Sequence, residues 1–318
     1  MRIPTFDDVL AAKDLLADHL QTTPAWNYPV LNDAVGATVW VKHENVQPVG
    51  AFKVRGGLNL LASLSAEQRA RGVIAASTGN HAQSVAYAAR RFGAPCTIVM
   101  PEKANPVKAA SVRALGAELV LRGAVFDDCR RIAGELAAES GAYYVDSGNE
   151  PLLISGVATA ALELFETVGE LDALFVPIGS GTGASGACLA ASGVAPNCRV
   201  IGVQSAQAPA AYDSWRAGAL VDRPNETVIE GISTGSPFAL PQEIMRAHLH
   251  DFLLVDDAEI RSAQRLMITA AHTMAEGAGA APLAGLLNRR ADYAGQRIGL
   301  ICSGGNASEQ ELAEVLKA

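Results

Sequence analysis

The stretch GVIAASTGNHAQSVAYAARRFG, residues 72–93, decides the fold class. It opens with a short apolar run, GVIAAS, and closes with fourteen residues of helical spacing that end at Gly93. A polar turn over residues 77–80 joins the two parts. A buried strand that passes through a tight turn into a helix is the repeating unit of parallel sheets covered on both faces. The stretch therefore predicts an α/β protein.

The same unit recurs on both sides of this stretch. Further strand-like runs lie at residues 38–44, 95–100, 117–123, 142–147, 172–180, 198–205, 250–257 and 297–306. Helical spacing fills most segments between them, with an amphipathic helix expected over 5–20 and a long one over 258–277. Two series of such units predict two lobes, each a mostly parallel, twisted sheet with helices on both faces.

We assign residues 1–65 and 149–318 to a large lobe and residues 66–148 to a small lobe. No low-complexity linker separates them, so we expect the lobes to pack directly against each other. The cleft between two such lobes is the default place for a ligand.

Composition and charge narrow the class of partner. The chain has 318 residues, of which 49% are hydrophobic and 18% charged, so it can bury a large core in one or two domains. A net charge of −8 argues against a nucleic-acid partner. The five cysteines are widely spaced, which argues against a disulfide framework or a zinc site. No apolar run reaches the roughly 18 residues of a membrane helix, and we expect a cytoplasmic protein without a membrane partner.

A glycine-rich turn, PIGSGTGASG at residues 177–186, follows one of the predicted strands and opens a helix. Its central residues are Gly179, Ser180, Gly181, Thr182 and Gly183. The glycines leave backbone amides open at a helix N-terminus, and the two hydroxyl side chains add donors. This combination favours an anion, most often phosphate, although an ordinary tight turn would have the same glycines. Neither the Walker motif nor the dinucleotide fingerprint fits.

Two weaker turns have the same position between strand and helix. ASTGNHAQS, residues 76–84, offers amides that can hold a carboxylate, although Ser, Thr and Asn are also good helix caps. His81 in this turn can equally be a capping or packing residue. CSGGNAS, residues 302–308, places Ser303 after a buried strand.

Lys53 is the remaining clue. It is one of only six lysines, and in VGAFKVRGG, residues 49–57, it follows Phe52 and precedes a glycine-flanked arginine. Open α/β sheets bind ligands at the carboxyl ends of their strands, where the three polar turns lie. A phosphate cradle, a carboxylate-holding turn and an isolated lysine together suggest pyridoxal phosphate, whose aldehyde forms a Schiff base with lysine.

On these motifs the chain resembles the fold-type II pyridoxal-phosphate enzymes, which have a tryptophan synthase β-like fold, and among them the serine/threonine dehydratases, or threonine ammonia-lyases. GAFKVRGG resembles the family's SFKxRGA segment, STGNHAQ its S-x-GNHAQ loop, and GSGTG stands in the place of its tetraglycine loop. EGAGA at 276–280 and SGGN at 303–306 resemble two later motifs. The resemblance covers essentially the whole chain, in order.

The resemblance implies elimination of water from a β-hydroxy-L-amino acid, threonine or serine, to a 2-oxo acid and ammonia. Lys53 would hold pyridoxal 5'-phosphate and, once free, take the α-proton. Phe52 would lie against the cofactor ring, Asn80 would bond its phenolic oxygen and Ser303 its pyridine nitrogen. The glycine-rich turn from Gly179 to Gly183 would bind the phosphate.

Other residues acquire expected roles by the same resemblance. Ser77, Thr78, Gly79 and His81 would bind the substrate carboxylate. Gly231 and Glu276 would flank the cofactor. A homodimer is expected, and no C-terminal regulatory domain.

Several positions depart from the family pattern. Ala51 replaces a serine, and Ser180 and Thr182 replace two glycines of the phosphate loop. Family members with a divalent-cation site carry carboxylates where Gln204 and Ala210 stand, so we expect no metal there. His248 and His250 could bind a metal only with a further carboxylate, and a solvated loop is the simpler interpretation.

Four alternatives stay open. Thr78 could act as a catalytic proton donor opposite Lys53, which would make the protein a serine-racemase-like isomerase. The unusual segment 230–241, with Pro237 and Phe238, could admit a bulkier substrate such as phenylserine. β-Replacement and a non-catalytic binding function are the other two.

Overall fold

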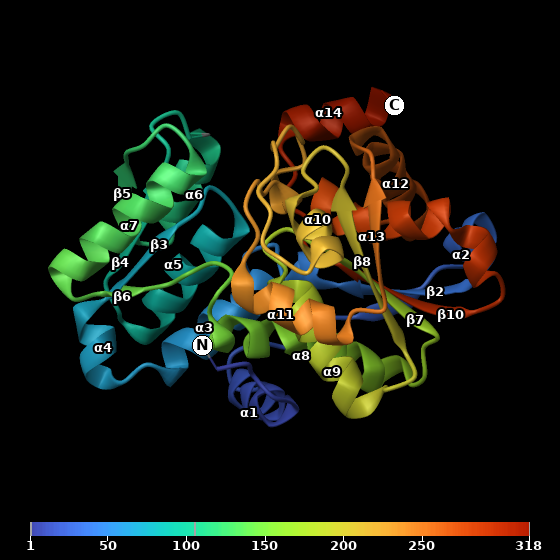
Figure 1. Ribbon diagram of the computed structural model, residues 1–318, viewed down its shortest axis with the longest axis horizontal. Coiled ribbons are helices and arrows are strands. Elements are labelled where there is room, and N and C mark those ends of the chain that lie inside the picture. The colour runs from blue at the N-terminus through green and yellow to red at the C-terminus, as the bar shows by residue number, and fades with distance from the viewer. Residues whose placement is uncertain (1, 105, 318) are drawn as a thin grey trace.

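The computed structural model describes residues 2–104 and 106–317, which form two lobes, each built on its own sheet (Figure 1). Every pair of neighbouring strands in these two sheets is parallel except β1 with β2, and helices cover both faces of each sheet. The predicted α/β class with two mostly parallel sheets is confirmed.

The larger sheet has six strands in the order β1-β2-β10-β7-β8-β9. These are β1 (Ala25–Asn27), β2 (Thr38–His43), β10 (Arg297–Cys302), β7 (Ala173–Pro177), β8 (Arg199–Ser205) and β9 (Asp251–Val255). Only β1 is antiparallel to its neighbour. β10, late in the sequence, lies in the middle, where Gly299 pairs with Trp40 on one side and with Leu174 on the other.

Helices sandwich this sheet in two layers. One layer consists of α2 (Pro29–Val35), α12 (Asp257–Ala271) and α13 (Gly277–Asn288), and the other of α1 (Phe6–Leu16), α8 (Pro151–Val168), α9 (Thr182–Val194) and α11 (Ala239–His248). Alternate strand residues serve the two layers: Phe175 packs on the first side, and Leu174 and Val176 pack on the second. The helices α10 (Ala210–Ala217) and α14 (Glu309–Lys317) and the short turns η1 (Glu44–Val46), η2 (Glu230–Ile232) and η3 (Arg290–Tyr293) complete this lobe.

The helix α8 has the length and mean hydropathy, 1.4, of a membrane-crossing helix, and 67% of it is buried inside the protein. Its buried side chains, such as Ile154 and Leu162, belong to the core between the sheet and its helices. These features are those of a core helix of the large lobe.

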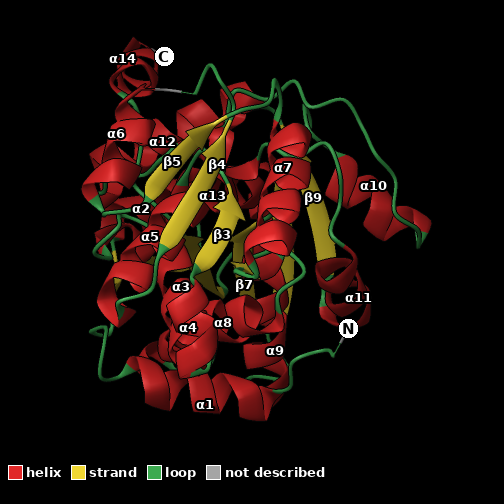
Figure 2. Ribbon diagram, turned by 90° about the vertical axis from the view of Figure 1, so that its left-hand side faces the viewer, coloured by secondary structure: helices red, strands yellow, loops and turns green. Residues whose placement is uncertain are grey.

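The smaller sheet has the order β5-β4-β3-β6, all parallel (Figure 2). Its strands are β3 (Val73–Ala76), β4 (Cys96–Met100), β5 (Glu118–Leu121) and β6 (Tyr143–Tyr144). The helix α7 (Phe126–Ser140) covers one face, and α5 (Asn80–Phe92), α6 (Pro106–Ala114) and α3 (Lys53–Ser63) lie on the other, with α4 (Ala66–Arg71) at the end of α3. The boundaries expected for the small lobe, 66–148, enclose all four strands, and they stay a prediction.

The helix α3 joins the two lobes, and the glycine pair of VGAFKVRGG explains how. A Cβ on Gly56 would lie 2.9 Å from the carbonyl oxygen of Leu153 in α8, and a Cβ on Gly57 would lie 2.8 Å from the carbonyl oxygen of Ser84 in α5. Both helices therefore approach the backbone of α3 more closely than any side chain would allow.

The helix expected over 258–277 is confirmed as far as Ala271 and is wrong after that residue. The helix α12 ends at Ala271, and a separate helix, α13, begins at Gly277. His272 adopts a left-handed conformation with φ 50°, and the amide of Thr273 donates to Met267 O at 3.0 Å, which closes the last turn. The first helix is also shorter than expected, since α1 ends at Leu16 rather than at residue 20.

Candidate active site

A cavity of about 250 Å³ lies between the lobes and gathers every site residue predicted from the sequence. These are Phe52, Lys53, Ser77, Thr78, Gly79, Asn80, His81, Gly179, Ser180, Gly181, Thr182, Gly183, Gly231, Glu276 and Ser303. They follow the carboxyl ends of β3, β7 and β10 or begin a helix, as expected for open α/β sheets. Their individual roles stay predictions.

Lys53 is the first residue of α3, and its amine faces the glycine-rich turn. Lys53 Nζ donates to Thr182 Oγ1 at 2.7 Å and to Ser180 Oγ at 3.4 Å, and it lies 5.2 Å from the centre of the Phe52 ring. Burial lowers the pKa of Lys53 to about 8, so a much larger share of this amine is neutral near pH 7.5 than for an exposed lysine. The neutral amine is the form that attacks an aldehyde.

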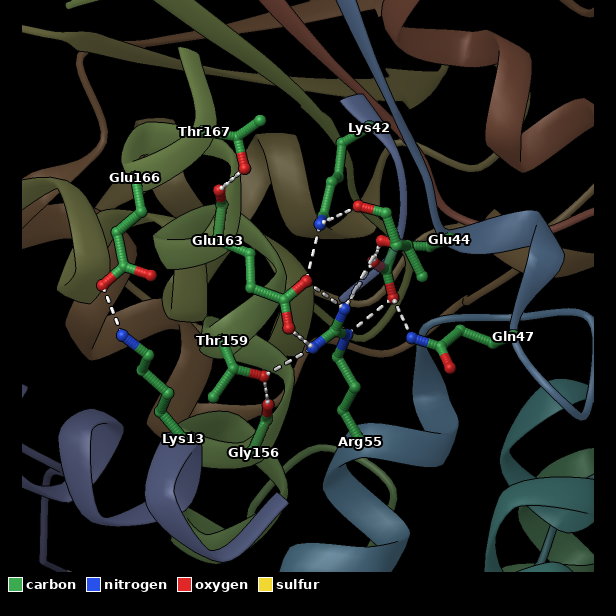
Figure 3. A network of polar contacts seen from close by, with 11 residues as sticks. Lys13, Lys42, Glu44, Gln47, Arg55, Gly156, Thr159, Glu163, Glu166 and Thr167 are labelled. Carbon is green, nitrogen blue, oxygen red and sulfur yellow. Dashed lines mark hydrogen bonds and ion pairs between the residues drawn. The ribbon is translucent and has the colours of Figure 1, made fainter. Parts of the chain in front are cut away.

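A buried ionic cluster fixes the start of α3 (Figure 3). The Arg55 guanidinium binds Glu44 at 2.7 and 2.8 Å and Glu163 of α8 at 2.7 Å through both carboxylate oxygens. Lys42 Nζ of β2 binds Glu163 at 2.6 Å. Two cations and two carboxylates make the cluster formally neutral, which is the condition for burying charges. Because Arg55 lies two residues after Lys53, the cluster holds the lysine segment against the large lobe.

The glycine-rich turn connects β7 to α9 and can only be made of small residues. Gly181 has φ +91°, and a Cβ on Gly179 would lie 2.7 Å from Gly231 O. A Cβ on Gly183 would lie 3.2 Å from the Phe52 ring. The first amides of α9 have no partner within the helix. Together with the Ser180 and Thr182 hydroxyls and the Lys53 amine they form a set of donors that suits a phosphate.

Asn80 is held by two side chains from other parts of the chain. Asn80 Nδ2 donates to Glu276 Oε1 at 2.6 Å, and Asn306 Nδ2 donates to Asn80 Oδ1 at 2.8 Å and to Val49 O at 2.8 Å. Burial raises the pKa of Glu276 to about 7, and the hydrogen bond from Asn80 opposes this rise. Sequence analysis missed the part of Asn306, although it is the last residue of the SGGN motif.

The turn after β3 supplies the side of the cavity predicted to bind the substrate carboxylate. The amide of Gly79 donates to Ser77 Oγ at 3.1 Å, which shapes the turn before α5 begins at Asn80. His81 is 5% exposed, and its Nε2 has no hydrogen-bond partner among residues 2–104 and 106–317. Burial, and to a smaller extent the positive charge of Lys53, lowers the pKa of His81 to about 3, so its ring is neutral. An unpaired buried ring nitrogen that lines a cavity is suited to a polar ligand.

Most of the remaining cavity wall was not predicted from the sequence, apart from Phe238 in segment 230–241, which was considered as a border of the substrate pocket. Lys108 of α6 forms an ion pair with Glu230 of η2, so that the pair joins the lobes at the cavity. Phe126, Ser147 and Phe238 also line the cavity. Residues such as these lie outside any motif, and only the packing of the two lobes brings them to the site.

Some family members bind a divalent cation through a carboxylate at the position of Gln204. In this protein Gln204 lies in β8, apart from the cavity. Gln204 is fully buried, and its Oε1 accepts a hydrogen bond from the Tyr212 amide at 3.0 Å. Within residues 2–104 and 106–317 no three His, Cys, Asp or Glu side chains gather as a metal site would need, and this includes His248 and His250. The expectation that the protein needs no metal stays a prediction.

Comparison with known proteins decides the family. The family model for pyridoxal-phosphate dependent enzymes matches residues 16–304. The chain belongs to this family. It is 36% identical to the L-threo-3-hydroxyaspartate ammonia-lyase of Saccharomyces cerevisiae, over 99% of this chain and 97% of the relative. It is 37% identical to the L-threonine ammonia-lyase of Thermotoga maritima, over 95% of this chain and 75% of the relative.

The structural comparison agrees. Maize serine racemase superposes with a TM-score of 0.93 at 30% identity, over 99% of this chain and 98% of that one. The protein is therefore a pyridoxal-phosphate dependent enzyme of the ammonia-lyase and dehydratase type. Its cavity fits the cofactor, because the donor set at Gly179–Gly183 suits the phosphate, Lys53 suits the aldehyde, and Ser303 and Asn80 remain for the polar atoms of the ring.

Proposed function

We propose that the protein removes water from L-serine or L-threonine to give a 2-oxo acid and ammonia. The observation that carries this proposal is the Lys53 amine, with a pKa of about 8, held at 2.7 Å from Thr182 Oγ1 within a cavity that suits the cofactor. An amine of this pKa accepts a proton at neutral pH and can return it, as a general base must.

The residues around Lys53 have complementary tasks. Pyridoxal phosphate, when bound, withdraws electrons from the substrate's α-carbon. Lys53 Nζ takes the α-proton from that carbon. Ser303 is buried and offers a hydroxyl, which binds a ring nitrogen without the negative charge of a carboxylate. The Ser77 and Thr78 hydroxyls, with the first amides of α5, orient the α-carboxylate at the start of that helix, where the helix dipole favours a negative charge.

A β-hydroxyaspartate is the second candidate substrate. The Saccharomyces relative is named for this substrate, and Lys108 is a cation in the cavity wall that could meet a second carboxylate. Lys108 is already paired with Glu230, so a dicarboxylate would have to replace that partner.

Racemisation is a further outcome that the site permits. Thr78 lines the cavity and carries a hydroxyl, and a structural relative is named a serine racemase. A racemase needs a proton donor and acceptor on the face opposite Lys53, and a threonine hydroxyl alone is a weak acid.

The test uses purified enzyme loaded with cofactor. L-serine, L-threonine and L-threo-3-hydroxyaspartate are supplied separately, 2-oxo acid is followed by absorbance, and D-amino acid by chiral chromatography. We expect oxo acid from serine or threonine and none from the Lys53→Ala variant. If only hydroxyaspartate gave oxo acid, it would replace serine and threonine as the assigned substrate. If D-serine formed without oxo acid, racemisation would replace dehydration as the assigned reaction.

A homodimer and a cytoplasmic location are also proposed, on the family resemblance and on the free state of the five cysteines. Sedimentation velocity measures the first, and fractionation of the source cells measures the second.

A further inference from the structure

Phe238 lies at the boundary between the lobes and belongs to the cavity wall. It directly precedes α11 of the large lobe, it is 3% exposed, and its ring packs against the small lobe. A Cβ on Gly148 would lie 2.2 Å from two ring carbons of Phe238. The ring therefore occupies the space that any side chain at position 148 would take.

Contacts on other sides fix the orientation of this ring. The Arg130 guanidinium of α7 lies 4.8 Å from the ring centre and 3.6 Å from the Asp146 carboxylate. The positive guanidinium is attracted by the negatively polarised face of the ring. The ring is thus held between a glycine and a guanidinium, both supplied by the opposite lobe.

The backbone on each side of the contact is also tied down. Asp146 Oδ1 accepts hydrogen bonds from the amides of Gly148 and Asn149, each at 2.9 Å, and Asn149 Oδ1 accepts one from the Leu240 amide at 3.1 Å. A hydrogen bond therefore joins the segment after β6 to the start of α11, directly beside Phe238.

The location relative to the substrate follows from the order of the strands. β6 is the neighbour of β3, and residues 77–80 follow β3 just as Ser147 and Gly148 follow β6. Ser147, Phe238 and the carboxylate turn line one cavity. A substrate whose α-carboxylate binds at residues 77–79 therefore shares one cavity with the Phe238 ring.

We propose that Phe238 is the specificity-determining residue of this cavity and restricts the β-substituent of the substrate to hydrogen or methyl. This inference rests on the proposed lyase function and narrows it to small β-hydroxy amino acids. It also opposes the hypothesis that segment 230–241 admits phenylserine, because Phe238 fills space that an aryl group would need.

The test compares kcat/KM and the dissociation constant for L-threonine and L-threo-phenylserine in the holoenzyme and in Phe238→Ala. The dissociation constant comes from the absorbance change on adding amino acid, so it is obtained with or without turnover. We expect the native enzyme to prefer threonine, and the variant to shift the phenylserine-to-threonine ratio upward by roughly tenfold or more.

Phe252→Ala is the matched control, since Phe252 is also 3% exposed in the large lobe but does not line the cavity. It should lower stability and leave the ratio unchanged. Gly148→Ala keeps Phe238 but displaces its ring. This variant should weaken the binding of threonine more than the binding of serine.

An unchanged ratio in a folded, cofactor-loaded Phe238→Ala, or the same shift in Phe252→Ala, would overturn the proposal. Failure of the lyase function would look different: no oxo acid would form from serine or threonine in the native enzyme, while the ratio of dissociation constants would still report on Phe238.

Discussion

The environment of the half-buried Lys53 differs from that of the fully buried Lys42, and the difference explains their separate uses. Burial lowers the pKa of both Lys53 and Lys42. At Lys42 the carboxylates of Glu44 and Glu163 oppose that shift, whereas at Lys53 burial is the only cause. Lys42 is thus held as part of an ionic cluster, while Lys53 keeps a reactive amine.

The lowered pKa of Lys53 predicts a pH dependence of stability. Between pH 8 and the ordinary lysine value of 10.5, the unfolded chain holds a proton at this residue that the folded cofactor-free protein has released. The free energy of unfolding should therefore rise with pH in this window, by up to about 1.4 kcal/mol per pH unit. Below pH 8 both states are protonated and the dependence should vanish.

Urea denaturation of the cofactor-free protein and of Lys53→Met measures the free energy of unfolding of each from pH 7 to 10. The difference between the two curves isolates Lys53 from the other groups that titrate. Parallel curves would mean that the amine has an ordinary pKa.

Gln204 carries a second prediction at this scale. Its neutral side-chain amide is fully buried and accepts a hydrogen bond from the backbone amide of Tyr212. Residue 210 is an alanine, so positions 204 and 210 together offer too little negative charge for a hard cation. A chelator should leave both kcat/KM and Tm unchanged. A loss of activity in chelator that Mg²⁺ or Ca²⁺ restores would show that a cation binds elsewhere in the protein.

The helix α3 is the element on which the site depends. It begins with Lys53, contacts α8 through Gly56 and α5 through Gly57, and is tied to the large lobe by Arg55. Arg55 is 1% exposed, and its guanidinium binds the carboxylates of Glu44 and Glu163 and the hydroxyl of Thr159 in the large lobe's core. An aliphatic side chain there would leave Glu44 buried without a strong cation.

Arg55→Met should therefore lower the free energy of unfolding by about 3–5 kcal/mol, the usual cost of breaking a buried ion pair from one side. Arg71→Met is the control, because Arg71 pairs with Glu67 on the surface of α4 and should cost less than about 1 kcal/mol. Chemical denaturation of both holoenzymes compares them. Equal effects would show that the cluster does not stabilise α3.

The local pattern of the sequence was sufficient to predict most helices and strands and the residues of the motifs. The run at 72–93 becomes β3 and α5, with the helix ending at Gly93 as expected. Contacts between distant segments could not be read from it. Examples are Asn306 on Asn80, 226 residues apart, and Phe238 on Gly148, because each side chain alone is compatible with many partners. The break between α12 and α13 was hidden by continuous helical spacing.

At the scale of the whole molecule, the cavity exists only because two separate cores meet. Each lobe has its own buried core on both faces of its sheet. Contacts across the boundary include Asn80 with Glu276, Phe238 with Gly148, and Lys108 with Glu230. The relative position of the lobes thus sets the shape of the site.

The Lys108–Glu230 pair predicts how that position responds to salt and mutation. Glu230 is mostly exposed, so the pair should add less than about 1 kcal/mol to global stability. Lys108→Gln should nevertheless increase hydrogen exchange in α6 and η2, with a smaller effect at high salt. Lys13→Gln, which removes a pair between α1 and α8 within one lobe, should leave α6 unchanged. Equal exchange in α6 for all three proteins would contradict the role of this pair.

The central place of β10 has a consequence for the order in which the molecule forms during translation. The strands of the small sheet, β3 to β6, are contiguous in the sequence and can pair while later residues are still being made. The large sheet cannot, because β2 and β7 to β9 have no common edge until Arg297–Cys302 is inserted between them. Domains fold as units during synthesis at about 5–20 residues per second. The two halves of the large sheet can therefore join only after Arg297–Cys302 has been made, so we expect the large lobe to complete its fold after the small one.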